Sequence, residues 1–233
     1  MLIRPGADTR PWTSTELRAL DALAVETYGI PSLVMMEHAG AGAAREIHAW
    51  LERRGVPDPA PVVILAGPGN NGGDGFVVAR WLALFGRPVR VLLCAAPERL
   101  RGDARLEHAI ARAAELEFLD QPAVAEVDAQ LARCGAAVDA LLGTGSQGPP
   151  REPIAAWIEA LNQAGAAGRP VAALDLPSGL DPDSGGGGAV VRTGLTVSFA
   201  APKPAFWTSG GKAAAGEVVV VPIGAPLAAL RRG

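Results

Sequence analysis

Cysteine is scarce in this chain of 233 residues. Cys94 and Cys134 are the only two, they share no Cys-x-x-Cys spacing, and no histidine neighbours either of them. The sequence therefore carries no signature of a disulfide framework or of a zinc site. Both cysteines are expected to act as small apolar fillers of the core.

Aromatic residues and positive charge are also in short supply. Phe, Trp and Tyr make up 5% of the chain and the net charge is −3, which argues against a base-stacking surface and against nucleic acid as a partner. No apolar run approaches the roughly 18 residues needed to span a bilayer, and no leader-like apolar stretch opens the sequence. We expect a cytoplasmic protein that does not bind membranes.

Apolar runs that alternate with amphipathic stretches dominate the sequence instead. With 49% hydrophobic residues, the length suits one α/β domain spanning 1–233. Two helices come first, the earlier one opened by a capping box of Thr13 and Glu16. Parallel βαβ units follow, in a sheet of seven or eight strands. The predicted strands are 62–65, 89–93, 117–119, 136–141, 171–174, 195–199 and 217–221, and the helices between them are 75–84, 103–114, 123–132 and 153–163.

Three loops after predicted strands have an unusual composition. In a parallel sheet such loops open on one edge, where α/β folds bind ligands. The first runs from Gly67 to Gly75 and leads into a helix. Its glycines let backbone N–H groups approach a ligand, and the helix offers its positive end to an anion such as pyrophosphate. Asp74 has two compatible roles there, a ligand contact and a plain helix N-cap.

The same loop also matches the dinucleotide fingerprint Gly-x-Gly-x-x-Gly through Gly67, Gly69 and Gly72, so an NAD-dependent oxidoreductase is an alternative. That fingerprint expects an acidic residue near the end of the second strand to hold the ribose hydroxyls. Here the strand ends in Leu92-Leu93-Cys94-Ala95-Ala96, and no distinct second domain carries a hydride-transfer site. The sequence disfavours the oxidoreductase.

The second and third loops each follow an aspartate. Asp139 lies in an apolar run, where a buried carboxylate needs a cation, a hydrogen-bond network or solvent, and the glycines after it suit contact with phosphate. Asp175 stands where a parallel strand ends and is the better candidate for acid–base chemistry, with a turn-forming aspartate as the alternative. Asp181 is typical of a surface turn.

Four motifs in order closely resemble the YjeF N-terminal domain family, whose enzymes are NAD(P)H-hydrate epimerases. They are Met36-Glu37-His38-Ala39-Gly40, the Gly-Asn-Asn-Gly-Gly-Asp run ending at Asp74, Asp139 with Gly143-Thr144-Gly145, and Asp175-Leu176-Pro177-Ser178-Gly179. The resemblance covers nearly the whole chain. It implies a Rossmann-like three-layer α/β/α sandwich with a mostly parallel sheet, often a homodimer. Hydrated NADH or NADPH, written NAD(P)HX, would be the substrate rather than a cofactor, and a separate dehydratase would complete the repair, because no dehydratase domain is fused to this chain.

The resemblance also assigns roles to individual residues. It implies a potassium ion held by Asn71, Asp139 and Ser178, whose oxygens suit a hard cation. The family usually has asparagine where this chain has His38, so a contact made from that position is expected to differ. The implied substrate contacts are Asn70, Asn71, Gly72, Gly73, Asp74, Gly143, Thr144, Gly145, Ser146, Gln147, Gly148, Pro149 and Asp175.

Asp175 is the predicted catalytic residue. Loss of the C6 hydroxyl of the hydrate leaves an iminium-like cation that the ring nitrogen stabilises, and water can return on either face. A carboxyl group that protonates the leaving hydroxyl and later accepts a proton from water would catalyse this exchange. Lys203, between two prolines, is interpreted as a solvated loop lysine rather than a contact to substrate phosphate.

A non-catalytic scaffold or dinucleotide-binding domain of the same fold is the alternative of a different class. Loss of the polar loop residues would favour it. All of them are present in this chain, namely Asn71, Asp74, Asp139, Asp175 and Ser178.

Overall fold

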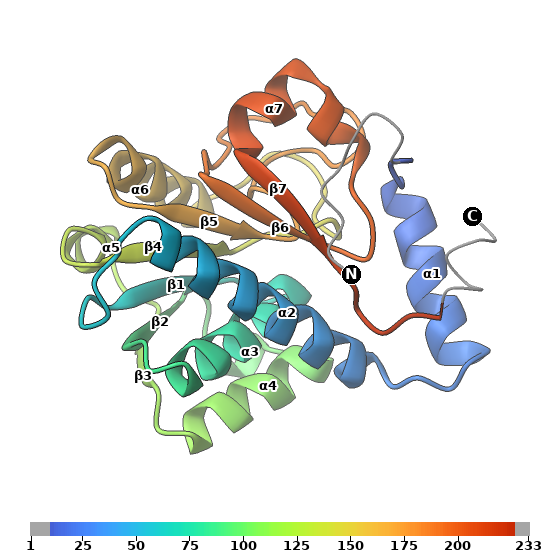
Figure 1. Ribbon diagram of the computed structural model, residues 1–233, viewed down its shortest axis with the longest axis horizontal. Helices are drawn as coiled ribbons and strands as arrows, with labels where there is room; N and C mark the ends of the chain where they lie inside the picture. The colour runs from blue at the N-terminus through green and yellow to red at the C-terminus, as the bar shows by residue number, and fades with distance from the viewer. Residues whose placement is uncertain (1–9, 227–233) are drawn as a thin grey trace.

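Residues 10–226, which the computed structural model describes, form a seven-stranded sheet with helices on both faces (Figure 1). Every strand is parallel to its neighbours, in the order β3-β2-β1-β4-β5-β6-β7. The strands are β1 (Val62–Ala66), β2 (Val89–Leu93), β3 (Glu117–Asp120), β4 (Ala136–Ala140), β5 (Val171–Leu174), β6 (Leu195–Phe199) and β7 (Glu217–Val221). The helices are α1 (Ser14–Glu26), α2 (Ser32–Arg53), α3 (Asn70–Leu84), α4 (Gly102–Ala113), α5 (Val124–Leu131), α6 (Ile154–Ala166) and α7 (Ser209–Ala215), with short 3-10 turns η1 (Pro97–Arg99) and η2 (Pro204–Trp207).

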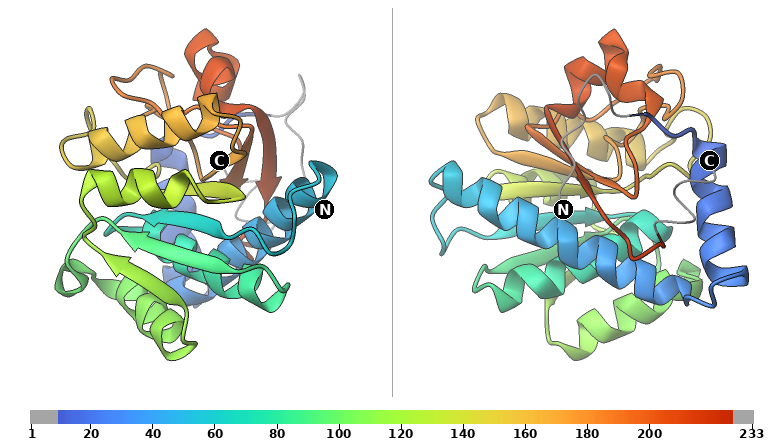
Figure 2. Two further views of the ribbon diagram at one scale, coloured as in Figure 1. Left: turned by 90° about the vertical axis from the view of Figure 1, so that its left-hand side faces the viewer. Right: turned by 45° about the vertical axis from the view of Figure 1, so that its right-hand side comes forward.

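The α/β class, the three layers and the two N-terminal helices predicted from the sequence are confirmed. Side chains alternate along each strand, so one set packs under α2 and α3 and the other under α5 and α6. Ile64 and Val138 belong to the first core, whereas Val63 and Ala137 belong to the second. Figure 2 shows the sheet between these two layers of helices.

Two predictions about elements were wrong. The third helix begins at Asn70, not at Gly75, so most of the first glycine-rich loop is helical. Helix α7 was missed, because its Ser-Gly-Gly-Lys sequence has little helical character. It is capped by the Thr208 side chain, which accepts a hydrogen bond from Gly211 N.

The chain reverses its direction of travel across the sheet at β1. It moves outward from β1 to β2 and β3, then returns to β4 on the other side of β1. Ligands of open α/β sheets bind at such a switch point, beyond the carboxyl ends of the strands. The segments after β1, β4 and β5 meet there, and these three carry the glycines and aspartates singled out above.

Helix α1 lies across the carboxyl ends of the last strands, away from the two helical layers (Figure 1). Its Leu17 and Leu20 pack with Trp12 and Ala201 in a small separate core. The predicted capping box at its N-terminus is confirmed. Ser14 ties the helix to the loop after β5, because its N and Oγ each donate to an Asp183 carboxylate oxygen at 2.8 Å. No helix within residues 10–226 is long and apolar enough to cross a bilayer.

The backbone approaches so closely at the switch point that there is no space for a side chain at Gly67. A Cβ at this position would lie 1.9 Å from the carbonyl oxygen of Leu141, whereas a Cβ at Gly69 would meet nothing within 4 Å. Gly67→Ala should therefore lower the free energy of unfolding by about 2–3 kcal/mol, the upper range for overpacking. Gly69→Ala, which changes only the N-cap of α3, should cost less than about 1 kcal/mol. Urea unfolding of the two variants measures the difference, and equal losses would contradict this account of the switch point.

Candidate active site

The first predicted polar segment forms the opening of α3. Gly69 is the N-cap residue, so the interpretation of Asp74 as N-cap is wrong. Asn71, Gly72, Gly73 and Asp74 are all buried, and Asn70 is exposed. The first backbone N–H groups of the helix have no partner within it, as in any α-helix, so they remain available to an anion.

Asp139 is fully buried at the end of β4 and is held by hydrogen bonds from two segments. Ser178 donates to it twice, from N to Oδ2 at 2.8 Å and from Oγ to Oδ1 at 2.6 Å, and Leu141 N donates to Oδ1 at 3.2 Å. Burial raises its pKa to about 6, although these hydrogen bonds act in the opposite direction. No cationic side chain within the described part of the chain pairs with it.

Asn71 reaches the same network from α3. Its Nδ2 donates to the carbonyl oxygen of Leu142 at 2.9 Å, and Leu142 N donates to Ser178 Oγ at 2.9 Å. The other end of the amide, Asn71 Oδ1, is buried and has no hydrogen-bond partner within residues 10–226. An orphaned amide oxygen and a buried carboxylate in one network are both costly unless a further group satisfies them. The donor set fits the potassium ion that the resemblance implied.

Asp175 follows β5 in the left-handed region, at φ 66°, which a non-glycine residue seldom adopts. Its Oδ2 accepts hydrogen bonds from Thr144 N at 2.7 Å and Thr144 Oγ1 at 2.6 Å. Its Oδ1 lies 2.5 Å from Lys203 Nζ. Burial alone would raise the pKa of Asp175, but the Lys203 ammonium and the Thr144 donors outweigh it and hold the pKa below its usual value. Asp175 is therefore ionised at neutral pH.

The sequence interpretation of Lys203 as a solvated loop residue was wrong. The side chain has 0% exposure, and besides Asp175 its Nζ contacts Ser198 Oγ at 2.8 Å and Phe199 O at 3.2 Å. Three acceptors thus occupy the three protons of the ammonium. Ala-Pro-Lys-Pro looks like an exposed loop locally, and the carboxylate that draws the lysine inward belongs to a distant segment.

Two further carboxyl groups share the electrostatic environment of Asp175. Asp74 is 8% exposed, and its pKa is raised well above the usual value by burial, with Asp175 and Asp21 adding repulsion. Asp21, on α1, is exposed, yet desolvation by its surroundings and the charge of Asp175 raise its pKa to about 6. Sequence reasoning missed Asp21. Its position one turn after Leu17 placed it beside the apolar stripe of α1, which is a weak signal.

Gly143 lies close to both Asp175 and Asn71. A Cβ on it would lie 3.0 Å from Asp175 Oδ2 and 3.2 Å from Asn71 Cβ, so a larger residue would have to displace one of these side chains. The predicted convergence of Asn71, Asp139, Asp175 and Ser178 is thus found in the structure. We call these four residues, with Asp74 and Lys203, the polar cluster.

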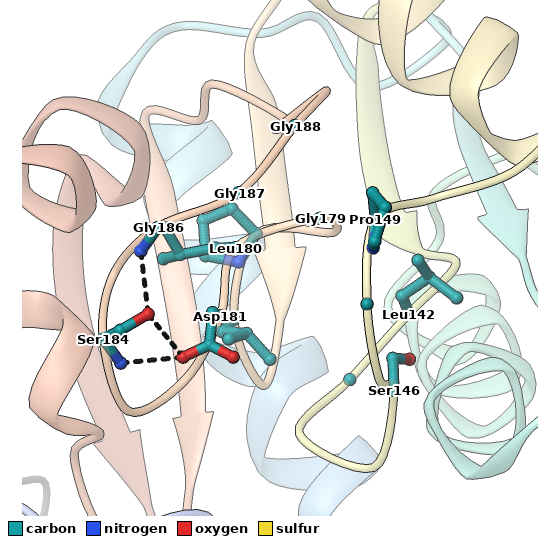
Figure 3. A pocket seen from close by; sticks show the side chains of 14 residues that line it. Leu142, Ser146, Pro149, Gly179, Leu180, Asp181, Ser184, Gly186, Gly187 and Gly188 are labelled. Carbon is teal, nitrogen blue, oxygen red and sulfur yellow. Dashed lines mark hydrogen bonds between the residues drawn. The ribbon is translucent and has the colours of Figure 1, made fainter.

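A cavity of about 320 Å³ adjoins the cluster, because it is lined by sequence neighbours of Asp175 and Ser178 and by part of the loop after β4, residues 141–149, which we call the β4 loop. Of the predicted substrate contacts, it is lined by Gly143, Ser146, Gly148 and Pro149, while Gly145 and Gln147 are exposed and do not line it. The facing wall is the segment 176–188 (Figure 3). There Asp181 forms the predicted surface turn, accepting hydrogen bonds from Ser184 N and Oγ at 2.7 Å.

His38, the departure from the family pattern, is exposed on α2. It packs against the turn at Gly224, where an added Cβ would lie 2.5 Å from His38 Nδ1. A larger open groove is lined in part by Trp50, Arg192 and Gly194, and like the smaller cavity it is lined by no residue of the polar cluster. Unlike that cavity, it includes no residue of the loop after β4.

Comparisons with known proteins agree on one family. The model of the YjeF-related protein N-terminus matches residues 32–205. The NAD(P)H-hydrate epimerase of Pirellula staleyi is 41% identical over 217 residues, covering 91% of this chain and 92% of that protein. The epimerase of Rhodopirellula baltica is 39% identical, covering 100% and 91%. The crystal structure of the yeast protein ynu0 superposes with a TM-score of 0.76 at 28% identity, covering 84% of this chain and 82% of the yeast chain.

Proposed function

The chain belongs to the YjeF-related N-terminal family, and from this membership we propose that it is an NAD(P)H-hydrate epimerase, an isomerase of nicotinamide nucleotide repair. It interconverts the R and S forms of NAD(P)HX at C6 of the nicotinamide ring. Relatives about 40% identical over nearly the whole chain carry this name. The scaffold alternative loses its support, because every polar loop residue is present and takes part in a hydrogen bond, an ion pair or a buried site.

The observation that carries the proposal is an ionised Asp175 held beside a glycine loop and a helix N-terminus. The carboxylate favours the cation that forms when the C6 hydroxyl departs, and it can accept a proton from the water that returns. Thr144 and Lys203 keep it charged and fix its direction. The helix N-terminus and the β4 loop offer backbone N–H groups to the pyrophosphate, and the adjoining cavity gives room for a further part of the dinucleotide.

Asn71, Asp139 and Ser178 would hold the potassium ion. Its charge would neutralise the buried Asp139 carboxylate and satisfy the orphaned Asn71 Oδ1. Ser178 and Asn71 also hold Leu142 by hydrogen bonds and so position the start of the β4 loop.

Potassium should therefore stabilise the fold. Replacing it by tetramethylammonium at equal ionic strength should lower Tm by roughly 2–4 °C for each kcal/mol of lost binding free energy. Asn71→Ala should remove this dependence on potassium, whereas Asn70→Ala, at the exposed neighbour, should keep it. Differential scanning calorimetry measures the effect. A wild-type Tm that is equal in both salts would count against the ion site.

Relatives that combine two activities suggest how the enzyme operates. The bifunctional NAD(P)H-hydrate repair enzyme Nnr of Salinibacter ruber is 39% identical, and the match covers 92% of this chain and 40% of that protein. This chain would supply epimers to a dehydratase that accepts one of them. Action in the cytoplasm as a homodimer stays a prediction, and sedimentation equilibrium of the purified protein measures the oligomer.

The function is tested with separated R and S epimers of NADHX and NADPHX. Each pure epimer is incubated with the purified chain, and the approach to the equilibrium mixture is followed by chromatography. The proposal predicts faster equilibration in proportion to enzyme concentration for at least one of the two hydrates. Rates equal to those in buffer for both would refute it.

A further inference from the structure

Epimerisation through loss of the C6 hydroxyl needs a proton donor as well as a base, and Asp175 is not a proton donor in the observed state. Both of its carboxylate oxygens accept hydrogen bonds or ion-pair contacts from Thr144 and Lys203. A carboxylate with this many donors has no proton to give. In this protonation state another group must protonate the leaving hydroxyl.

Lys203 is not free to act as the acid either. Its ammonium is fully buried and already donates to Ser198 Oγ and Phe199 O while it pairs with Asp175. Transfer of a proton from Lys203 would leave Asp175 buried without its cation, which is strongly unfavourable.

Asp74 differs from both residues. More than nine-tenths of its surface is buried, yet its carboxyl group makes no hydrogen bond or ion pair with any residue of the range 10–226. It lies in the second turn of α3, beyond the first turn in which the helix dipole would favour a carboxylate. It lies three residues after Asn71 on the same helix, and an added Cβ at Gly143 would lie 3.2 Å from Asn71 Cβ and 3.0 Å from Asp175 Oδ2. Asp74 is therefore placed at the same site, and its charge interacts with those of Asp175, Asp21 and Lys203. Burial and these neighbours favour the neutral acid.

We propose that Asp74 is the catalytic acid of this site and that it gives its proton to the departing C6 hydroxyl while Asp175 serves the opposite face of the ring. The inference rests on the proposed function and deepens it. The C6–O bond breaks, its electron pair stays on oxygen, and the proton from Asp74 completes a water molecule. The nitrogen lone pair forms the N1=C6 bond of the cation.

A second water then attacks C6 from the other face and gives one proton to Asp175, which restores the neutral hydrate. Asp74 is now a carboxylate and Asp175 a carboxylic acid. This is the protonation state required for the reverse epimerisation, so the two carboxyl groups exchange roles between the two directions. Two titratable groups with pKa values displaced in opposite directions are the usual basis of such an assignment.

Asp21 is the rival donor, because it is also close enough to interact with Asp175. It is exposed on α1, however, whereas Asp74 is 8% exposed. The groups that surround Asp74 electrostatically are Asp21 of α1, Glu107 of α4, Asp175 after β5 and Lys203 after β6. The test must therefore distinguish loss of the Asp74 carboxyl group from loss of the Asp21 carboxyl group.

The test compares Asp74→Asn, Asp74→Glu and Asp21→Asn, with Asp128→Asn on the exposed side of α5 as the matched control. We expect Asp74→Asn to lower kcat by at least about 100-fold, the lower range for loss of general acid catalysis, and Asp74→Glu to recover part of it. The affinity for NADH, measured by fluorescence, should stay within about threefold. Asp128→Asn should match the wild type.

The pH profile gives a readout that a structural role would not produce. Wild-type kcat/KM should fall as pH rises and Asp74 loses its proton, and this alkaline limb should be absent from the residual activity of Asp74→Asn. Near-wild-type kcat in Asp74→Asn, or a 100-fold loss in Asp21→Asn instead, would overturn the assignment. If the wild type itself does not speed equilibration, the proposed function fails, whereas an active wild type with an active Asp74→Asn refutes only this inference.

Discussion

Asp175→Asn is expected to lower epimerisation turnover by about 10³- to 10⁴-fold, the upper range for loss of an acid–base group. Asparagine keeps the size of the side chain and can still accept a hydrogen bond from Thr144. It carries no charge to stabilise the iminium-like cation, however, and it cannot accept a proton from water. We propose that the helix N-terminus and the β4 loop supply most of the substrate binding, so the affinity for NADH should change little. Steady-state kinetics on separated epimers, with NADH binding in parallel, measures both.

Asp128→Asn is the control here as well, because it makes the same chemical change on an exposed helix face. Circular dichroism should show that both variants are folded. Turnover of Asp175→Asn within tenfold of the wild type would remove Asp175 from the chemistry.

Lys203→Met is expected to cost about 3–5 kcal/mol of stability, the usual loss when one partner of a buried ion pair is removed. The chain offers a matched control, because Lys203 and Lys212 are its only lysines and Lys212 is exposed on α7. Lys212→Met should change stability by less than about 0.5 kcal/mol. Turnover of Lys203→Met should also fall, because Asp175 loses the cation that keeps it ionised.

The loss in Lys203→Met should depend on pH in a defined direction. In the wild type the folded-state pKa of Asp175 lies below its unfolded value, so its contribution to stability is present above the unfolded pKa and disappears as pH falls through the folded one. In the variant no cation opposes the effect of burial, so the folded-state pKa of Asp175 should be higher than in the wild type. The difference in unfolding free energy should therefore be largest near pH 7 and should shrink as pH falls from the higher folded-state pKa of Asp175 in the variant to its lowered pKa in the wild type. Urea unfolding across this range tests it, and a difference independent of pH would show that Lys203 contributes only packing.

The local pattern of apolar residues was sufficient to predict the positions of the strands. Runs such as 89–93, 171–174 and 195–199 were predicted with the observed bounds, because buried parallel strands are short, apolar and bounded by glycine, proline or polar residues. The start of α3 was not predictable in this way. Asn70, Asn71, Gly72 and Gly73 are poor helix formers. The close packing of Gly72 on the Gly67 carbonyl, where a Cβ would lie only 1.9 Å away, is a tertiary contact that the local pattern does not show.

The convergence of the polar residues at one edge of the sheet could be predicted from topology, but their protonation states could not. Parallel strands place Asp139 and Asp175 at one edge of the sheet whatever the details. Which carboxyl group is ionised depends on partners that no local pattern shows. Lys203 sets the charge of Asp175 from another loop, and Asp74 has no hydrogen bond or ion pair with any residue from 10 to 226. The proposed roles of acid and base therefore depend on contacts between segments that are distant in the sequence.

Oxygen-18 incorporation during epimerisation tests the central claim most directly. A single epimer of NADHX is incubated with the wild-type chain in ¹⁸O-labelled water, and each epimer is analysed by mass spectrometry beside a control without enzyme. The account predicts inversion much faster than in the control, with one solvent oxygen in every inverted molecule. Enzyme-dependent inversion that leaves the original oxygen in place, or no acceleration at all, would contradict it.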